Sequence, residues 1–233
     1  MRFYQSNKRV AQNEDMQTVP VVVGSLLGAT LAADSDLNYW SFIMVKEGNK
    51  MNSDKYIMTV DEGTSSCRTL IIDQSGNIKG SNKIELRKQY PQGQQGWVEH
   101  DPIEIWNNQL TTMIQALNKS KISPKAIAAI GITNQRETTV IWNRETGLPV
   151  YNAIVWQDRR TTSYCEQLIK SGWKEKVHKK TGLLIDAYFS ATKIKWIIDN
   201  IPEARTLAAE GKLAFGTIDS WLIYKMTTGV DKK

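Results

Sequence analysis

The 233-residue sequence has few of the residues that build disulfide frameworks and metal centres. It contains two cysteines, Cys67 and Cys165, and two histidines, His100 and His178. No pair of them has the spacing of a zinc site or a redox motif, which excludes a His-rich metal centre. Two isolated cysteines are typical of reduced thiols inside a cell, so we expect a cytoplasmic protein.

Glycine-rich phosphate loops and long hydrophobic runs are also missing. Neither the Walker A pattern nor G-x-G-x-x-G occurs, which excludes a P-loop or a Rossmann dinucleotide site. The apolar run at residues 19–33 (VPVVVGSLLGATLAA) contains Pro20 and two glycines. It is short for a transmembrane helix, which needs about 20 apolar residues, so we expect no membrane span.

The excess of positive charge is small and mostly dispersed. The net charge is +6, with hydrophobic and charged fractions of 41% and 23% that are typical of a soluble globular protein. One local group of lysines lacks the interleaved aromatic residues of a nucleic-acid surface and indicates a solvated helix face. We therefore expect no nucleic-acid partner. The group comprises Lys174, Lys176, Lys179 and Lys180.

Residues 1–50 differ in character from the rest of the chain. A signal peptide is disfavoured because Glu14 and Asp15 stand just before the apolar run. The tripeptide KEG at residues 46–48 is what a purine-rich ribosome-binding sequence would encode, and Met51 follows at a suitable distance. We therefore predict that residues 1–50 are a non-homologous leader, either disordered or translated from a start codon assigned too early. A genuine extension, disordered or lying on a membrane surface, is the alternative.

Residues 51–233 predict one domain in which strands precede helices. Asp101, Pro102 and Glu104 form a capping-box start for a helix whose apolar residues recur at helical spacing to Leu117. The apolar run 126–133 predicts a strand buried on both faces of a sheet. This order predicts an α/β domain with a mixed sheet and flanking helices, incomplete at the C-terminus. The other predicted strands are 56–60, 68–73, 78–86, 138–142, 150–156 and 213–215, and the other predicted helices are 161–170, 173–179, 192–200, 203–210 and 219–226.

The stretch DEGTSSCR, which begins at Asp61, joins two strands with more polar groups than a turn needs. Glycine lets the backbone approach an anion, and successive N–H groups form an anion-binding nest. The hydroxyls of Thr64, Ser65 and Ser66 add donors. Arg68 offers a fork for phosphate oxygens, and Asp61 can hold Mg²⁺ through water. An ordinary polar turn explains the same residues equally well.

Two further polar clusters follow predicted strands, where α/β proteins gather their ligands. Arg136 and Glu137 offer donors and acceptors together, which suits a polyol. Trp156 can cover the C–H face of a polyol and donate from its indole N–H, and Tyr188 can add a hydroxyl. The alternatives are a surface ion pair for Arg136 and Glu137 and core packing for the two aromatic residues.

Taken together, six stretches resemble the amino-terminal part of the FGGY carbohydrate kinases, and within them the glycerol kinases. They are DEGTSSCR, GWVEHDPIEIW, AAIGITNQRETT, YNAIVWQDRR, TGLLIDAYFSATKIKWI and FGTIDSWLIYKMTTG. The resemblance implies a ribonuclease H-like domain of the actin/hexokinase-type ATPases. It also implies in-line transfer of the γ-phosphoryl of ATP to glycerol, giving sn-glycerol 3-phosphate, with Mg²⁺ as the metal.

The resemblance also implies roles for particular residues and partners for the chain. Glycerol and ATP or ADP would be its ligands, and the full-length relatives would be homo-oligomers. In this sequence the implied glycerol ligands are Arg136, Glu137, Trp156 and Tyr188, the implied phosphate ligands are Thr64, Ser65, Ser66 and Arg68, and Asp61 would lie near Mg²⁺.

The chain departs from the family pattern in two residues and in extent. Glu62 stands where many relatives have glutamine, and Ala191 where a glycine is frequent. The family's general base and second domain would follow the last resembling stretch, so we assign no catalytic residue and expect no activity from this chain alone. An inactive polyol- or phosphate-binding fragment, half of a split kinase, and a related sugar kinase remain alternatives.

Overall fold

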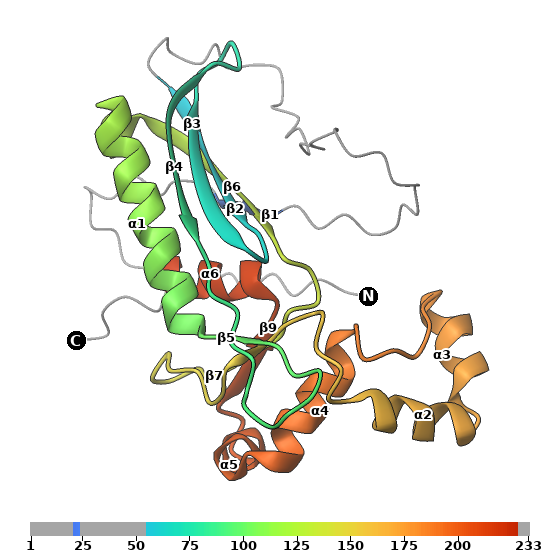
Figure 1. Cartoon of the computed structure of the whole chain (residues 1–233). Helices are drawn as coiled ribbons and strands as arrows, with labels where there is room; N and C mark the ends of the chain where they lie inside the picture. Colours follow the sequence, from blue (N-terminus) through green and yellow to red (C-terminus); the bar gives the residue numbers. More distant parts are fainter. Residues whose placement is uncertain (1–20, 24–54, 228–233) are drawn as a thin grey trace.

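A computed structural model describes residues 21–23 and 55–227 of the chain, and a mixed sheet of five strands forms its upper part (Figure 1). The strand order is β1-β6-β2-β3-β4. Strands β2, β3 and β4 form an antiparallel meander, as the sequence predicts, whereas β6 pairs in parallel with β2 and with β1. The bounds are β1 Val21–Val23, β2 Tyr56–Glu62, β3 Ser66–Ile72, β4 Ile78–Glu85 and β6 Ile127–Asn134.

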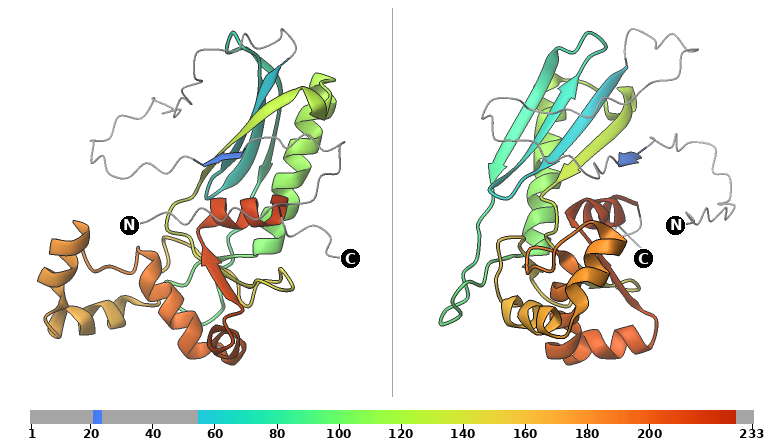
Figure 2. Two further views of the ribbon diagram at one scale, coloured as in Figure 1. Left: turned by 180° about the vertical axis from the view of Figure 1, so that it is seen from behind. Right: turned by 90° about the vertical axis from the view of Figure 1, so that its right-hand side faces the viewer.

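Helix α1 (Pro102–Ser120) covers one face of this sheet (Figure 2). It begins where predicted, because the Asp101 carboxylate accepts hydrogen bonds from the backbone N–H groups of Ile103 at 2.7 Å and Glu104 at 3.4 Å. Glu104, the other residue of the predicted capping box, thus takes part in the cap through its backbone amide. The helix lies so close to β4 that a Cβ on Gly80 would stand 2.5 Å from the carbonyl oxygen of Ala116, so only glycine fits there.

Below the sheet, two small antiparallel ribbons connect to five helices. Strand β5 pairs with β8, and β7 pairs with β9. Among the described residues, no helix is both long and apolar enough to span a bilayer. The remaining elements are β5 Glu99–His100, η1 Pro124–Ala126, β7 Val140–Asn143, β8 Ala153–Ile154, α2 Thr162–Lys170, α3 Trp173–Thr181, α4 Ser190–Asn200, α5 Pro202–Ala209, β9 Leu213–Gly216 and α6 Ile218–Thr227.

One large core joins the sheet to α1 and α6. Met58 and Val60 of β2 and Ile132 of β6 point into it, together with Ile105 of α1 and Trp221 of α6. The Trp221 indole N–H donates to the carbonyl of Pro102 at 2.9 Å and fastens α6 to the start of α1. Both helices therefore cover the same face of the sheet. A smaller core of Ile141, Ile154, Ile197 and Ala204 holds β7 and β8 against α4 and α5.

Two sequence predictions about the strands are wrong in part. Strand β6 is not buried on both faces: residues 128–131 stay half-buried, and the core shared with α1 and α6 lies on the face that carries Ile130 and Ile132. A Cβ on Gly131 would meet no described atom within 4 Å. The strand predicted at 150–156 is reduced to Ala153–Ile154, since the chain turns after Val155.

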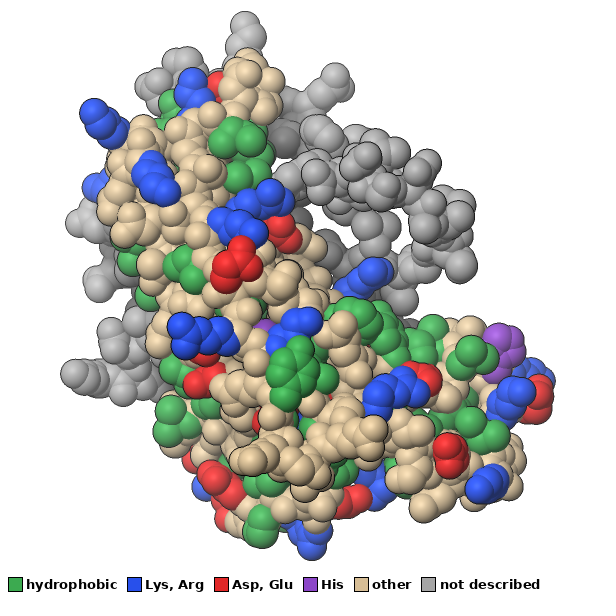
Figure 3. Space-filling view, in the orientation of Figure 1, with side chains coloured by type: hydrophobic (Ala, Val, Ile, Leu, Met, Phe, Trp, Pro, Cys, Tyr) green, Lys and Arg blue, Asp and Glu red, His purple; other side chains and the backbone are tan. Residues whose placement is uncertain are grey.

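The α/β class and the mixed sheet with flanking helices are confirmed. Predicted helix bounds agree with the observed ones to within about two residues, the usual scatter at fraying ends. The predictions for residues 1–50 lie outside the described residues except at Val21–Val23, whose residues pair with Ile130, Gly131 and Ile132. The leader hypothesis therefore stays a prediction. Positive and negative side chains are interspersed over the face shown in Figure 3.

Candidate active site

A cavity of about 340 Å³ opens at the carboxyl ends of β2 and β6. The two strands are parallel neighbours with Glu62 opposite Asn134, so the loops that follow them emerge at the same edge of the sheet. The volume lies in the usual range of ligand pockets, roughly 300–1,000 Å³. The lining residues are Gly63, Thr64, Asn134, Gln135, Arg136, Trp156 and Tyr188.

The turn after β2 is hydrogen-bonded directly to the two other polar clusters. The amide of Gly63 donates to the carbonyl of Ser66 at 3.0 Å and closes the turn. The indole N–H of Trp156 donates to Thr64 Oγ1 at 2.9 Å, and Gln135 Nε2 donates to the carbonyl of Gly63 at 3.2 Å. Three stretches that are far apart in the sequence therefore form one site.

Asp61 and Arg68 lie outside the cavity lining and bind each other. They face one another across β2 and β3, and Arg68 Nη2 donates to Asp61 Oδ2 at 2.9 Å. Both side chains are about one-third exposed, at 34% and 38%, so each can reach a ligand from solvent. Ser65 is exposed and Ser66 half-buried at the start of β3, also outside the lining.

Asp61 is the carboxylate of this edge that could hold Mg²⁺. The described residues contain no group of three or more His, Cys, Asp or Glu side chains placed as a metal site. A single, partly exposed carboxylate still fits Mg²⁺, which keeps several waters and takes its other ligands from nucleotide phosphates.

Glu62 is completely buried next to this turn, and neither of its carboxylate oxygens has a hydrogen-bond partner among the described residues. Burial, and secondly the charge of Asp61, raise the pKa of Glu62 well above the ordinary value of glutamate. Burial and then Glu62 raise the pKa of the neighbouring Cys67 thiol to about 12. Burial therefore favours the neutral form of both groups.

Arg136 and Glu137 follow β6 with different surroundings. Arg136 is exposed and lines the cavity. Glu137 lies behind the lining with a backbone φ of 64°, in the left-handed region that residues other than glycine seldom adopt. Its carboxylate accepts a hydrogen bond from Ser190 Oγ at 3.2 Å, and its carbonyl accepts one from Lys193 Nζ at 3.1 Å.

Trp156 and Tyr188 form an aromatic wall. Their rings meet edge to face with centroids 5.9 Å apart. The Tyr188 amide donates to Asp186 Oδ1 at 2.7 Å, and Asp186 in turn binds Arg159 through two hydrogen bonds of 2.8 and 3.2 Å. The bonds from Arg159 lower the pKa of Asp186, which stays ionised and anchors the loop that carries Tyr188.

The loop after Trp156 is fixed by Arg160, whose side chain is fully buried. Its guanidinium binds Glu99 at 2.7 Å and Asp158 at 2.9 Å, and it stacks on the ring of Trp97 with 3.8 Å to the centroid. All three guanidinium nitrogens donate hydrogen bonds and the cationic face lies on Trp97, which suits arginine and not lysine.

Of the predicted ligands, the structure brings Thr64, Arg136, Trp156 and Tyr188 together around the cavity. Sequence reasoning did not assign roles to Gly63, Asn134 and Gln135, although they adjoin the predicted clusters. It also missed two buried residues. The ring nitrogens of His100 lie 3.1 and 3.2 Å from the carbonyl oxygens of Arg87 and Thr64, and Lys193 lies beneath Glu137.

Comparisons with known proteins identify the family of the chain. Residues 56–231 match the FGGY family of carbohydrate kinases, N-terminal domain. The glycerol kinase of Mycoplasma capricolum subsp. capricolum is 59% identical over 178 residues, which cover 76% of this chain and 35% of that protein. The glycerol kinase of Koribacter versatilis is 54% identical over 174 residues, covering 75% and 34% of the two chains.

Solved structures give the same result for the fold. The crystal structure of Plasmodium falciparum glycerol kinase with ADP matches with a TM-score of 0.69 and 37% identity, over 75% of this chain and 35% of that one. A xylulose kinase from Rhodospirillum rubrum, at 17% identity and a TM-score of 0.63, shares the fold over 73% of this chain and 33% of its own. The chain spans about 35% of the length of the curated relatives that it matches. With most of its length matching the N-terminal domain, the chain belongs to the FGGY family of carbohydrate kinases.

Proposed function

We propose that this chain carries the glycerol-binding residues and the first phosphate-binding turn of a glycerol kinase, which transfers the γ-phosphoryl of ATP to glycerol and yields sn-glycerol 3-phosphate. One observation supports this above all. The hydrogen bond from Trp156 to Thr64 joins the candidate polyol wall to the candidate phosphate turn around a single cavity.

The polyol would bind on the β6 side of the cavity. Arg136 would donate to glycerol hydroxyls and Glu137 would accept from them, while Trp156 and Tyr188 would cover the carbon face. The Glu137 carboxylate has two oxygens, so it could accept from a glycerol hydroxyl and keep its bond to Ser190. The relatives that share more than half of their aligned residues with this chain are named glycerol kinases, which supports glycerol as the polyol.

The nucleotide phosphates would bind at the turn after β2. Thr64, Ser65 and Ser66 would donate from hydroxyl and backbone groups, and Arg68 would neutralise phosphate charge. Asp61 would hold Mg²⁺ through water, and the metal would neutralise charge on the phosphates during transfer. The ADP in the structure of the Plasmodium falciparum relative supports use of an adenine nucleotide.

We expect binding without turnover from this chain alone. None of the described residues that line the cavity carries a carboxylate, and Glu137 behind the lining would hold a glycerol hydroxyl rather than take the proton from the attacking one. Because the chain spans about a third of its relatives, catalysis by the whole enzyme, a homo-oligomeric state and a cytoplasmic location remain part of this proposal.

Titration calorimetry of the purified chain with glycerol tests the proposal. The wild type should bind glycerol in preference to xylulose, and Arg136→Ala should weaken glycerol binding by about tenfold or more, the loss of a charged hydrogen bond. Arg144→Ala is the matched control, since Arg144 is an exposed arginine on the turn after β7. Failure of the wild type to bind glycerol, or equal affinities in both variants, would refute it. A preference for xylulose would indicate a sugar kinase instead.

A further inference from the structure

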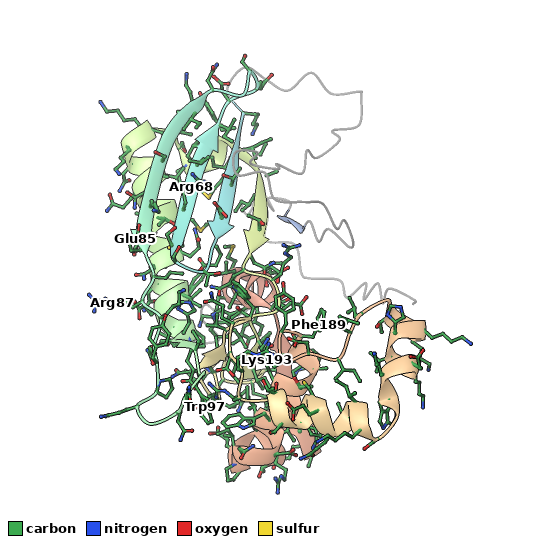
Figure 4. All side chains as sticks on the ribbon, turned by 45° about the vertical axis from the view of Figure 1, so that its right-hand side comes forward. Arg68, Glu85, Arg87, Trp97, Phe189 and Lys193 are labelled. Carbon is green, nitrogen blue, oxygen red and sulfur yellow. The ribbon has the colours of Figure 1, made fainter. Side chains whose placement is uncertain are left out.

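Lys193 in α4 is a lysine with no exposed surface, although it lies near the cavity (Figure 4). Its complete burial needs a physical explanation. Lysine is rarely buried completely, because its ammonium loses hydration that only hydrogen bonds and opposite charges can replace. An apolar side chain would fill the same space without that cost. We therefore expect the ammonium to make interactions that a methionine side chain could not make.

The partners of Lys193 are backbone carbonyls of two loops that are far apart in the sequence. Its Nζ donates to the carbonyl of Glu137 at 3.1 Å and also to the carbonyl of Tyr188. These two residues belong to the proposed polyol site and come from different loops. One ammonium thus ties the loop after β6 to the loop before α4.

Ser190, one helical turn before Lys193, reinforces the same connection. Its hydroxyl lies 3.3 Å from the Glu137 carbonyl and 3.2 Å from the Glu137 carboxylate. Glu137 needs such support, because a left-handed backbone is unfavourable for glutamate and persists only where its surroundings enforce it. The first turn of α4 provides that enforcement.

We infer that Lys193 is a positioning residue of the polyol site: its ammonium, assisted by the Ser190 hydroxyl, holds Glu137 and Tyr188 at the spacing that a small polyol requires. The inference rests on the proposed function, since it concerns how the same site is organised. Lys193 itself would not touch the substrate. Replacing Lys193 should therefore change the affinity for the polyol indirectly, by displacing Glu137 and Tyr188.

The burial of Lys193 makes this role dependent on pH. Burial lowers the pKa of Lys193 to about 8, against the opposing effects of Glu137, Asp158 and Asp186 and with a smaller contribution from Arg159. As the pH rises through about 8, the ammonium loses a proton and with it the charge that strengthens its bonds to the two carbonyls. Polyol affinity should fall over the same range.

The test uses the whole chain with Lys193→Met and a control on the same helix, Lys195→Met. Lys195 is exposed and pairs with Asp199 one turn away, so its loss should leave the site intact. Glycerol affinity is measured from pH 6.5 to 9.5. The wild type and Lys195→Met should bind at low pH and weaken through about pH 8, whereas Lys193→Met should bind about tenfold or more weakly with a flat profile.

A second measurement does not depend on glycerol. Hydrogen–deuterium exchange of the unliganded chain should show faster exchange in peptides containing Glu137 and Tyr188 in Lys193→Met, with no change in Lys195→Met. If Lys193→Met does not fold, Ser190→Ala serves in its place. It should speed exchange around Glu137 and weaken glycerol binding to a smaller extent, because only the hydroxyl bonds to Glu137 are lost.

The two proposals can fail separately. If the wild type binds no glycerol at any pH, the proposed function is wrong, and the exchange data alone decide whether Lys193 organises the loops. If exchange around Glu137 and Tyr188 is unchanged in both Lys193→Met and Ser190→Ala, or if Lys193→Met keeps the wild-type pH profile, Lys193 is not a positioning residue.

Discussion

Glu62 is the residue whose replacement should reveal most about the energetics of this domain. It is fully buried, neither of its oxygens has a hydrogen-bond partner in the part of the chain that the structure describes, and its pKa is raised by burial and by Asp61. In the unfolded chain, glutamate releases its proton near a pH of about 4.3. The folded chain keeps that proton to a higher pH. The unfolded state therefore binds fewer protons over this range, and the free energy of unfolding falls as the pH rises.

The substitution Glu62→Gln should remove this decrease in the free energy of unfolding with pH. Glutamine has nearly the same shape and is neutral at every pH, like the protonated glutamic acid that the fold prefers. Near pH 4 the two proteins should have similar stability, since both side chains are then uncharged. Above that, the advantage of Glu62→Gln should grow by about 1.4 kcal/mol for each pH unit over which folded Glu62 keeps its proton.

Urea unfolding of the wild type and Glu62→Gln at pH 4.5, 5.5, 6.5 and 7.5 measures the difference. Glu85→Gln is the control, because Glu85 is an exposed glutamate of the same sheet whose side chain is 73% accessible (Figure 4). The free energy of unfolding of Glu85→Gln should equal that of the wild type at each pH. Parallel pH curves for the wild type and Glu62→Gln, or a variant that is less stable throughout, would contradict the reasoning.

Three further substitutions test the packing that supports the site, each measured as a change in the free energy of unfolding. Gly80→Ala should cost about 1–3 kcal/mol because its Cβ collides with the backbone of α1, whereas Gly131→Ala in the same sheet should cost far less. Asp101→Ala should lose about 0.5–2 kcal/mol with the cap of α1, and a smaller effect would show that solvent replaces the cap. Arg160→Met should cost about 3–5 kcal/mol by leaving two buried carboxylates unpaired, against about 1 kcal/mol or less for Arg159→Met in its exposed pair.

The elements that the sequence predicts well are those with local signals. The meander β2–β4 follows from short turns between β-branched runs, and α1 from its cap at Asp101. Predicting the arrangement of the site requires one long-range contact, the parallel pairing of β2 with β6. The rule that ligands gather at strand ends anticipates this edge, which is why Thr64 and Arg136 were predicted from separate clusters and meet at one cavity.

Residues that act from behind the lining are harder to predict, because their chemistry depends on burial. Lys193 has a local signal, since it precedes buried Ile197 by one turn and so falls on the inward face of α4. A lysine at such a position is commonly assigned to the surface, where its ammonium is hydrated. Nothing in the sequence near Lys193 indicates that the carbonyls of Glu137 and Tyr188 replace that water.

Thr64 is the residue through which the two halves of the site act on each other. Its hydroxyl accepts the indole N–H of Trp156, and its carbonyl faces the buried ring of His100. The sequence suggests that the indole N–H of Trp156 serves a polyol, but in this structure that donor is bound to the turn. Trp156 can then offer a polyol its ring face while its N–H stays on Thr64. In the proposed site, directional recognition would then fall to Arg136 and Glu137, and a movement of the turn would displace Trp156 with it.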